Sequence, residues 1–181
     1  MKEIEVKVLK IDKSEIISKL KELGAVKIKD EYQYNYVFDR EDRFLKKEYN
    51  GYLRIRKTVS QNNKEEIELT LKRNISNSKF RENIENNLII NNVEEGIKIL
   101  EALGYKMIHK GEKKRDSYKY ESIMFEIDTW DKETYPYTYL EIEVEKEEDL
   151  KKAVKILGLN NKDVTKKSIE ELRDEEFGES N

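Results

Sequence analysis

Two stretches far apart in the chain alternate charged and aliphatic residues, "EIEVK" at residues 3–7 and "EIEVE" at residues 141–145. In a β-strand, successive side chains point to opposite faces, so this alternation separates charge from hydrocarbon. The face that carries Glu3, Glu5 and Lys7 is therefore entirely charged, and the other face is entirely aliphatic.

Other expected strands show the same separation, and the sign of their charge differs from strand to strand. Any one of these strands could be explained as a solvated polar face of a half-buried sheet. Acidic strands at both ends of the chain, with basic strands between them, are harder to explain in that way. The aligned pairs are Arg54 and Arg56, Thr70 and Lys72, Lys113 and Arg115, Glu126 and Asp128, and Glu141 and Glu143.

The periodicity of apolar residues predicts an α+β protein in which sheet dominates. Amphipathic helices are expected within residues 11–25, 92–105 and 147–159, each ending at a Leu-Gly pair. The first two follow strands and precede strands, which indicates a duplicated strand, helix and strand unit. Further strands are expected at residues 32–39, 52–59, 66–73, 79–86, 112–121, 122–130 and 139–146, with hairpin loops at residues 60–64 and 74–79.

If these strands close into a tunnel, their charged faces point into it and their aliphatic faces pack against the helices. Buried charges cost several kcal/mol each when uncompensated, so a ligand would have to complete the electrostatic balance. Carboxylates without neighbouring histidine or cysteine favour a hard cation, Mg²⁺ or Mn²⁺. Rows of arginine and lysine favour a polyanion, since guanidinium groups match phosphate oxygens. A metal-bound phosphate chain satisfies both requirements.

Composition narrows the other possibilities. The chain has 181 residues, of which 41% are charged, but its net charge is only −3, which argues against nucleic acid or a membrane as partner. It has no cysteine, which excludes disulfides and thiolate metal sites, and it begins directly with a charged strand, so we expect a cytoplasmic protein. We expect one domain at residues 1–177 and a loose tail at residues 178–181. The oligomeric state stays open, with a homodimer as one option.

Single residues with a possible chemical role have simpler explanations. His109 is the only histidine, so neither a Ser-His-Asp arrangement nor a common zinc site can be built around it, and a structural role is expected. Trp130 and the tyrosines of "YQYNYVF" could stack a base, although aromatic residues in strands are more often core. Lys166 or Lys167 could add a cation near the end of the chain.

Taken in order, "EIEVK", "LRIR", "LTLK", "KKR", "FEID" and "LEIE" resemble the motifs of the CYTH or triphosphate tunnel metalloenzyme superfamily, which includes class IV adenylyl cyclases and thiamine triphosphatases. The resemblance covers roughly residues 2–158. It implies a closed eight-stranded antiparallel β-tunnel with covering helices, Mg²⁺ or Mn²⁺ as cofactor, and action on a small-molecule triphosphate.

The resemblance also assigns roles by position. Catalytic roles are implied for Lys7, Glu5 and Glu143, with Lys7 orienting water or contacting the terminal phosphate. Metal binding is implied for Glu3, Glu5, Asp128, Glu141 and Glu143. Phosphate binding is implied for Lys7, Arg54, Arg56, Lys72, Lys113 and Arg115.

The leading hypothesis for function is a metal-dependent triphosphatase that hydrolyses inorganic triphosphate or a small organic or nucleoside triphosphate. The alternatives are a class IV adenylyl cyclase that converts ATP to cyclic AMP and pyrophosphate, a non-catalytic sensor of polyphosphate or nucleotide, and a structural sheet protein. The approach to the last acidic strand, "DTWDKETYPYTYLEIE", lacks the glycine usual in cyclase-like members, which leaves nucleotide specificity open.

Overall fold

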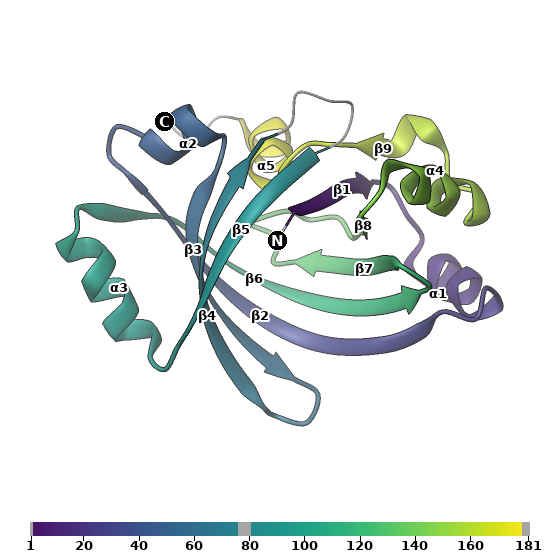
Figure 1. Ribbon diagram of the computed structural model, residues 1–181, viewed down its shortest axis with the longest axis horizontal. Coiled ribbons are helices and arrows are strands. Elements are labelled where there is room, and N and C mark those ends of the chain that lie inside the picture. The colour runs from purple at the N-terminus through teal and green to yellow at the C-terminus, as the bar shows by residue number, and fades with distance from the viewer. Residues whose placement is uncertain (1, 76–80, 179–181) are drawn as a thin grey trace.

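The strands form one antiparallel sheet that closes on itself (Figure 1). The computed structural model describes residues 2–75 and 81–178, with the backbone alone for residues 2, 3 and 161. Within these ranges the strand order is β5-β4-β3-β2-β6-β7-β8-β1-β9, and β1 also pairs with β5, so that β1 to β8 form a ring. The strands are β1 (Lys2–Val8), β2 (Val26–Arg40), β3 (Tyr52–Ser60), β4 (Glu65–Asn74), β5 (Arg81–Ile90), β6 (Tyr105–Tyr120), β7 (Ile123–Trp130), β8 (Tyr139–Val144) and β9 (Val164–Thr165).

This arrangement confirms the predicted eight-stranded tunnel. The strands β2 and β6 are much longer than their predicted segments, and they pair along most of their length. The predicted loop at residues 60–64 joins β3 to β4. Most of the predicted loop at residues 74–79, and the start of the strand predicted at residues 79–86, lie outside the described residues.

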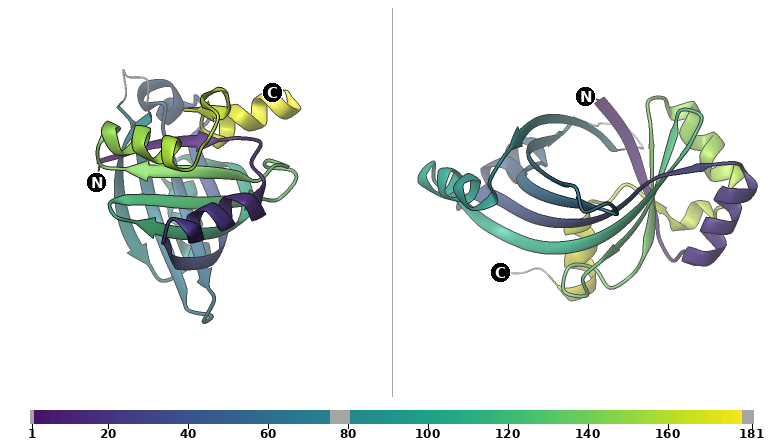
Figure 2. Two further views of the ribbon diagram at one scale, coloured as in Figure 1. Left: turned by 90° about the vertical axis from the view of Figure 1, so that its right-hand side faces the viewer. Right: turned by 90° about the horizontal axis from the view of Figure 1, so that it is seen from below.

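Five α-helices are found in the described ranges: α1 (Lys13–Glu22), α2 (Phe44–Tyr49), α3 (Val93–Ala102), α4 (Glu147–Ile156) and α5 (Ile169–Phe177). The right-hand view of Figure 2 looks into the ring, with α3 on one side and α1 and α4 on the other. The helices α1, α3 and α4 were predicted, whereas α2 and α5 were not. None of the helices in the described part of the chain is long and apolar enough to cross a bilayer.

The two predicted strand, helix and strand units begin and end as expected. The side chains of Asp12 and Asn92 accept the backbone N–H groups of Glu15 and Glu95, at 3.0 and 2.9 Å, and so cap α1 and α3. After α1, Gly24 adopts a φ of +83°, in the left-handed region that a glycine reaches without strain.

The division into one domain at residues 1–177 and a tail at residues 178–181 stays a prediction, and residues 179–181 lie outside the described residues.

The aliphatic faces of the strands form the core outside the ring. The largest cluster packs β1, β7 and β8 against α1 and α4, and includes Val6, Phe125 and Ile142 with Leu20 and Leu150. A second cluster lies under α3, and a third holds α5. The hydrocarbon therefore faces the helices, which leaves the charged faces for the inside of the ring.

The position of the core leads to a stability prediction. Ile142 has no exposed surface, so Ile142→Ala should lower the free energy of unfolding by about 2–5 kcal/mol. Leu88 is 62% exposed, and Leu88→Ala should change it by less than about 0.5 kcal/mol. Urea denaturation measures both changes. Equal effects of the two substitutions would contradict this assignment of the core.

Candidate active site

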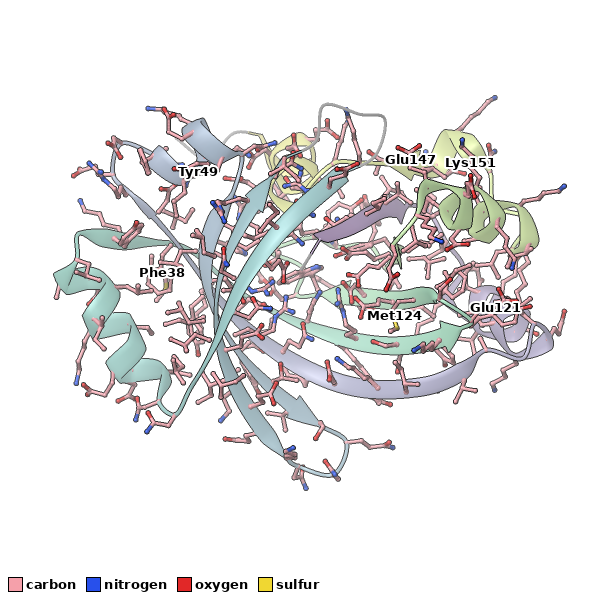
Figure 3. All side chains as sticks on the ribbon, in the orientation of Figure 1. Phe38, Tyr49, Glu121, Met124, Glu147 and Lys151 are labelled. Carbon is pink, nitrogen blue, oxygen red and sulfur yellow. The ribbon has the colours of Figure 1, made fainter. Side chains whose placement is uncertain are left out.

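The ring encloses a cavity of about 260 Å³ whose wall is made mainly of charged side chains. In Figure 3, side chains that carry nitrogen and oxygen atoms fill the space between the strands in the middle of the molecule. Basic side chains outnumber acidic ones in this wall. The predicted site residues Glu5, Lys7, Arg54, Arg56, Lys72, Lys113, Arg115, Glu141 and Glu143 all line it.

Three of the predicted metal ligands form a cluster. Glu5 on β1 lies directly opposite Glu143 on β8, and Glu141 lies opposite Lys7 in the same pairing. One carboxylate oxygen from each of Glu5, Glu141 and Glu143 lies within 4.8 Å of the others. The two glutamate-rich strands that are far apart in the sequence are therefore neighbours in the sheet. The backbone of Glu3 pairs with Asn83, while its side chain lies outside the described residues.

Cations surround the buried Glu5. Its carboxylate oxygens lie 3.2 Å from Lys72 Nζ, 3.5 Å from Arg81 Nε and 3.8 Å from Lys7 Nζ. Burial alone would raise the pKa of Glu5, but Lys72, Lys7 and Arg81 outweigh it and hold this pKa well below its ordinary value. Glu5 is therefore ionised at neutral pH, as a metal ligand must be.

A second charged group is centred on Asp128, which has no exposed surface. Asp128 accepts two hydrogen bonds from Arg115, at 2.7 and 2.6 Å, and one from Lys113 at 2.6 Å. The Tyr139 hydroxyl donates a fourth, at 3.1 Å. Asp128 thus orients two of the predicted phosphate-binding cations, and it is not one of the three clustered carboxylates. Arg115 also reaches Glu141 at 3.3 Å, which connects the two groups.

In parts of the wall, the positive charge of neighbouring cations exceeds the negative charge of the nearby acids. Burial, together with Arg115 close by, lowers the pKa of Lys113 to about 7 in spite of Asp128. Burial, together with Arg54 and Arg115, lowers the pKa of Arg56 to about 10. Arg54 is buried, and its Nε has no hydrogen-bond partner among the described residues. Such a wall is suited to an anion, which would stabilise the charged forms of these side chains.

Several residues of the wall were missed in the sequence. Arg81 and Glu85 lie an even number of positions apart on β5, so their side chains point to the same face of the strand. The same spacing of charged residues led to the prediction of Arg54 and Arg56. Arg43, Lys46 and Glu170 come from the unpredicted α2 and α5, where no repeating pattern marks them.

The remaining candidates have local partners. His109 lines the cavity, and its Nε2 lies 3.0 Å from Thr134 Oγ1. Trp130 lines it too, and its indole N–H donates to the Tyr139 hydroxyl at 3.0 Å. Lys167 pairs with Glu175 and is not among the lining residues. Lys166 is likewise not among them. Neither lysine therefore adds a cation to the cavity as described.

Comparison with known families decides the membership of the chain. The model of the CYTH domain matches residues 1–169. The chain belongs to the CYTH family. This confirms the resemblance found in the motifs. No curated protein matches.

Solved structures share the CYTH fold of this chain. The PH1012 protein from Pyrococcus horikoshii OT3 is 26% identical with a TM-score of 0.79, and the match covers 94% of this chain and 99% of that one. A protein from Vibrio parahaemolyticus named as an adenylate cyclase is 16% identical with a TM-score of 0.73, over 94% and 96% of the chains. A protein from Hippeastrum named as an adenylyl cyclase, with a dominant triphosphatase activity, is 16% identical with a TM-score of 0.65, over 92% and 90%.

The single histidine of this CYTH domain makes stability depend on pH. Burial, with Arg173 nearby, lowers the pKa of His109 below its ordinary value. Below about pH 6.5 an unfolded histidine takes up a proton that the folded one resists, so the free energy of unfolding falls as the pH falls. Urea denaturation at pH 7.5 and 5.5 should show a smaller loss for His109→Gln than for the wild type. Equal losses would mean that His109 titrates normally in the folded protein.

Proposed function

We propose that this protein is a triphosphatase that uses Mg²⁺ or Mn²⁺ to hydrolyse inorganic triphosphate or a small organic or nucleoside triphosphate inside the tunnel. The observation that carries the proposal is the cluster of Glu5, Glu141 and Glu143 beside buried cations in one enclosed cavity. An anion binder without a metal would need the cations and not three converging carboxylates.

The carboxylate cluster fits a hard divalent cation. Carboxylate oxygens are the donors that Mg²⁺ and Mn²⁺ prefer, and Glu5 is held ionised by its cationic neighbours. Glu5, Glu141 and Glu143 would hold the metal, with Glu3 as a further proposed ligand. Asp128 would assist through Arg115, which it holds and which also reaches Glu141. When bound, such an ion polarises phosphate oxygens and lowers the pKa of a coordinated water.

The cations of the wall bind and orient the phosphate chain. Arg54, Arg56, Lys72, Lys113 and Arg115 line the cavity, and guanidinium groups there neutralise the charge that develops on transferring phosphate oxygens. Lys7 lies 3.8 Å from Glu5 and 3.6 Å from Glu141, so neither acid holds it in a short hydrogen bond. Its Nζ is ion-paired with both acids, and it would turn to the attacking water or the terminal phosphate without breaking a short hydrogen bond.

The size of the cavity favours a compact substrate. At about 260 Å³ it is smaller than the roughly 300–1,000 Å³ typical of sites that enclose drug-sized ligands. A triphosphate chain is much smaller than a nucleotide. A dominant triphosphatase activity in the Hippeastrum protein of the same fold is consistent with this choice.

An assay with several substrates tests the proposed activity. With Mg²⁺ or Mn²⁺, the protein should release orthophosphate from inorganic triphosphate, ATP or thiamine triphosphate, and chelation of the metal should abolish release. Glu143→Gln should reduce turnover by about 100-fold or more, because it removes one charged ligand from the cluster. Glu145→Gln, at an exposed position just beyond β8, is the matched control and should leave turnover unchanged.

The products separate the alternatives. Cyclic AMP and pyrophosphate from ATP would replace the triphosphatase with the adenylyl cyclase. Tight binding of every triphosphate without turnover would favour the sensor. If the protein neither binds nor hydrolyses any triphosphate, the charged faces have only a structural role.

Lys113 links binding to proton uptake. At pH 8, most of a lysine with a pKa of about 7 is neutral, and a phosphate chain beside it favours the charged form. Metal-free binding of tripolyphosphate should therefore take up protons, measured by calorimetry in two buffers of different ionisation enthalpy. Lys113→Arg stays charged throughout, so it should bind with less uptake. The same uptake in both proteins would contradict the lowered pKa of Lys113.

A further inference from the structure

Arg43 and Lys46 form a pair of cations at one end of the tunnel. Both are carried by the α2 segment, and both line the same cavity as the candidate active site. A single carboxylate from α5 bridges them: one oxygen of Glu170 pairs with Arg43, and the other lies 2.7 Å from Lys46 Nζ. Figure 1 shows α2 and α5 on the same side of the molecule.

The backbone is built to hold this pair in place. Asp39 is completely buried, and its carboxylate accepts the backbone N–H groups of Leu45 at 2.9 Å and Lys46 at 3.0 Å. The residues that flank α2, Arg43 and Asn50, have φ values of 58° and 42°, in the left-handed region that residues other than glycine avoid. Such conformations persist where the surroundings enforce them, and they gather at ligand sites.

The bridge by Glu170 leaves positive charge uncompensated. Two cations face one carboxylate, and Arg173, which pairs with Asp174 at 3.6 Å, lines the cavity as well. The side chains of Arg43, Lys46 and Glu170 are 35%, 31% and 24% exposed. Water therefore screens the ion pairs between them, and these pairs are easily exchanged. Burial would raise the pKa of Glu170, but Lys46 and Arg43 outweigh it, so the carboxylate is anionic. A phosphate dianion has more charge and more acceptor oxygens than the carboxylate it would replace.

The exchange requires only a side chain to move. The helix α5 is anchored by Leu172, which is 3% exposed and packs with Tyr135 and Tyr139. Ser168 and Glu171 cap its first turn reciprocally. Rotation of the Glu170 side chain alone would therefore release Arg43 and Lys46 while α5 stays in place.

A series of contacts connects this pair to the proposed metal cluster. Arg81 lies 3.5 Å from Glu5 and 3.6 Å from Glu171, the residue that follows Glu170. Arg43 and Lys46 are thus adjacent to the candidate active site but separate from its predicted cations.

We propose that Arg43 and Lys46 form an additional phosphate-binding subsite at the α2 end of the tunnel, and that Glu170 occupies it until a phosphate group takes its place. The ligand is a phosphate dianion, either the last group of a linear polyphosphate with more than three phosphates or free orthophosphate. The inference rests on the proposed function, because a chain that reaches this subsite passes through the same tunnel.

Calorimetry without divalent metals tests the subsite, with tripolyphosphate, tetrapolyphosphate and orthophosphate as probes. If the subsite takes the end of a longer chain, the wild type should bind tetrapolyphosphate about tenfold more tightly than tripolyphosphate. If it takes free orthophosphate, the wild type should bind orthophosphate even when it is saturated with tripolyphosphate. The double variant Arg43→Gln/Lys46→Gln should lose that effect: its affinities for tetrapolyphosphate and tripolyphosphate should agree within about twofold, and orthophosphate should no longer bind beside tripolyphosphate. Glu170→Gln, a weaker competitor, should enlarge the effect.

Control variants and the combination of results distinguish a failure of the subsite from a failure of the proposed function. Lys47→Gln removes an exposed cation of α2, and Glu175→Gln removes an exposed acid of α5; both should behave as the wild type. If tripolyphosphate binds but the double variant changes neither tetrapolyphosphate nor orthophosphate binding, the subsite is wrong and the proposed function stands. If the wild type binds no tripolyphosphate without metals and also releases no orthophosphate from it with Mg²⁺ or Mn²⁺, the proposed function fails, and orthophosphate binding lost in the double variant would still support the subsite.

Discussion

The structure depends on the way in which the ends of the sheet meet. The strand β1 pairs with β8 on one edge and with the start of β5 on the other, and these pairings close the ring. They also put Glu5 among Lys72, Lys7 and Arg81, where a buried carboxylate is stabilised only by its cations. The pairing of β1 with β8 brings the acids together, and closure through the pairing of β1 with β5 brings Arg81 and Lys72 to Glu5. Closure therefore supplies the charge compensation, and without it the charged faces would meet water.

The charge pattern explains why the hydrocarbon lies outside the tunnel and the ions inside it. On β1, β7 and β8 the residues that face away from the lumen, such as Val6, Phe125 and Ile142, join the core under α1 and α4. Their neighbours face inward, where acidic strands lie beside one another and basic strands complete the wall. Asp128 illustrates the result, since it holds Arg115 and Lys113 in fixed positions without becoming part of the carboxylate cluster. A wall of oriented cations beside converging carboxylates is the arrangement that the proposed metal-bound phosphate chain requires.

The sequence was sufficient to predict a site residue wherever that residue lies in a strand whose charged and apolar side chains alternate. Alternation placed Glu5, Glu141 and Glu143 on one kind of face and Arg54 and Arg56 on another, and the order of these motifs, through its resemblance to the CYTH superfamily, implied the closed sheet. Alternation on β5 could have identified Arg81 as well. It could not find Arg43, Lys46 or Glu170, because α2 has only six residues and α5 is a charged helix with Leu172 as its one buried residue. Those positions are set by Asp39 and by contacts between segments distant in the sequence, which no local pattern encodes.

The central claim is that a metal ion and a phosphate chain share the enclosed tunnel. The most direct measurement is a crystal structure of the protein grown with Mn²⁺ and tripolyphosphate, with the ion located by its anomalous scattering. The account predicts one anomalous peak among the carboxylates of Glu5, Glu141 and Glu143, with the phosphate chain against Arg54 and Arg56. An ion and a phosphate chain bound only on the outer surface, with the tunnel holding neither, would contradict it.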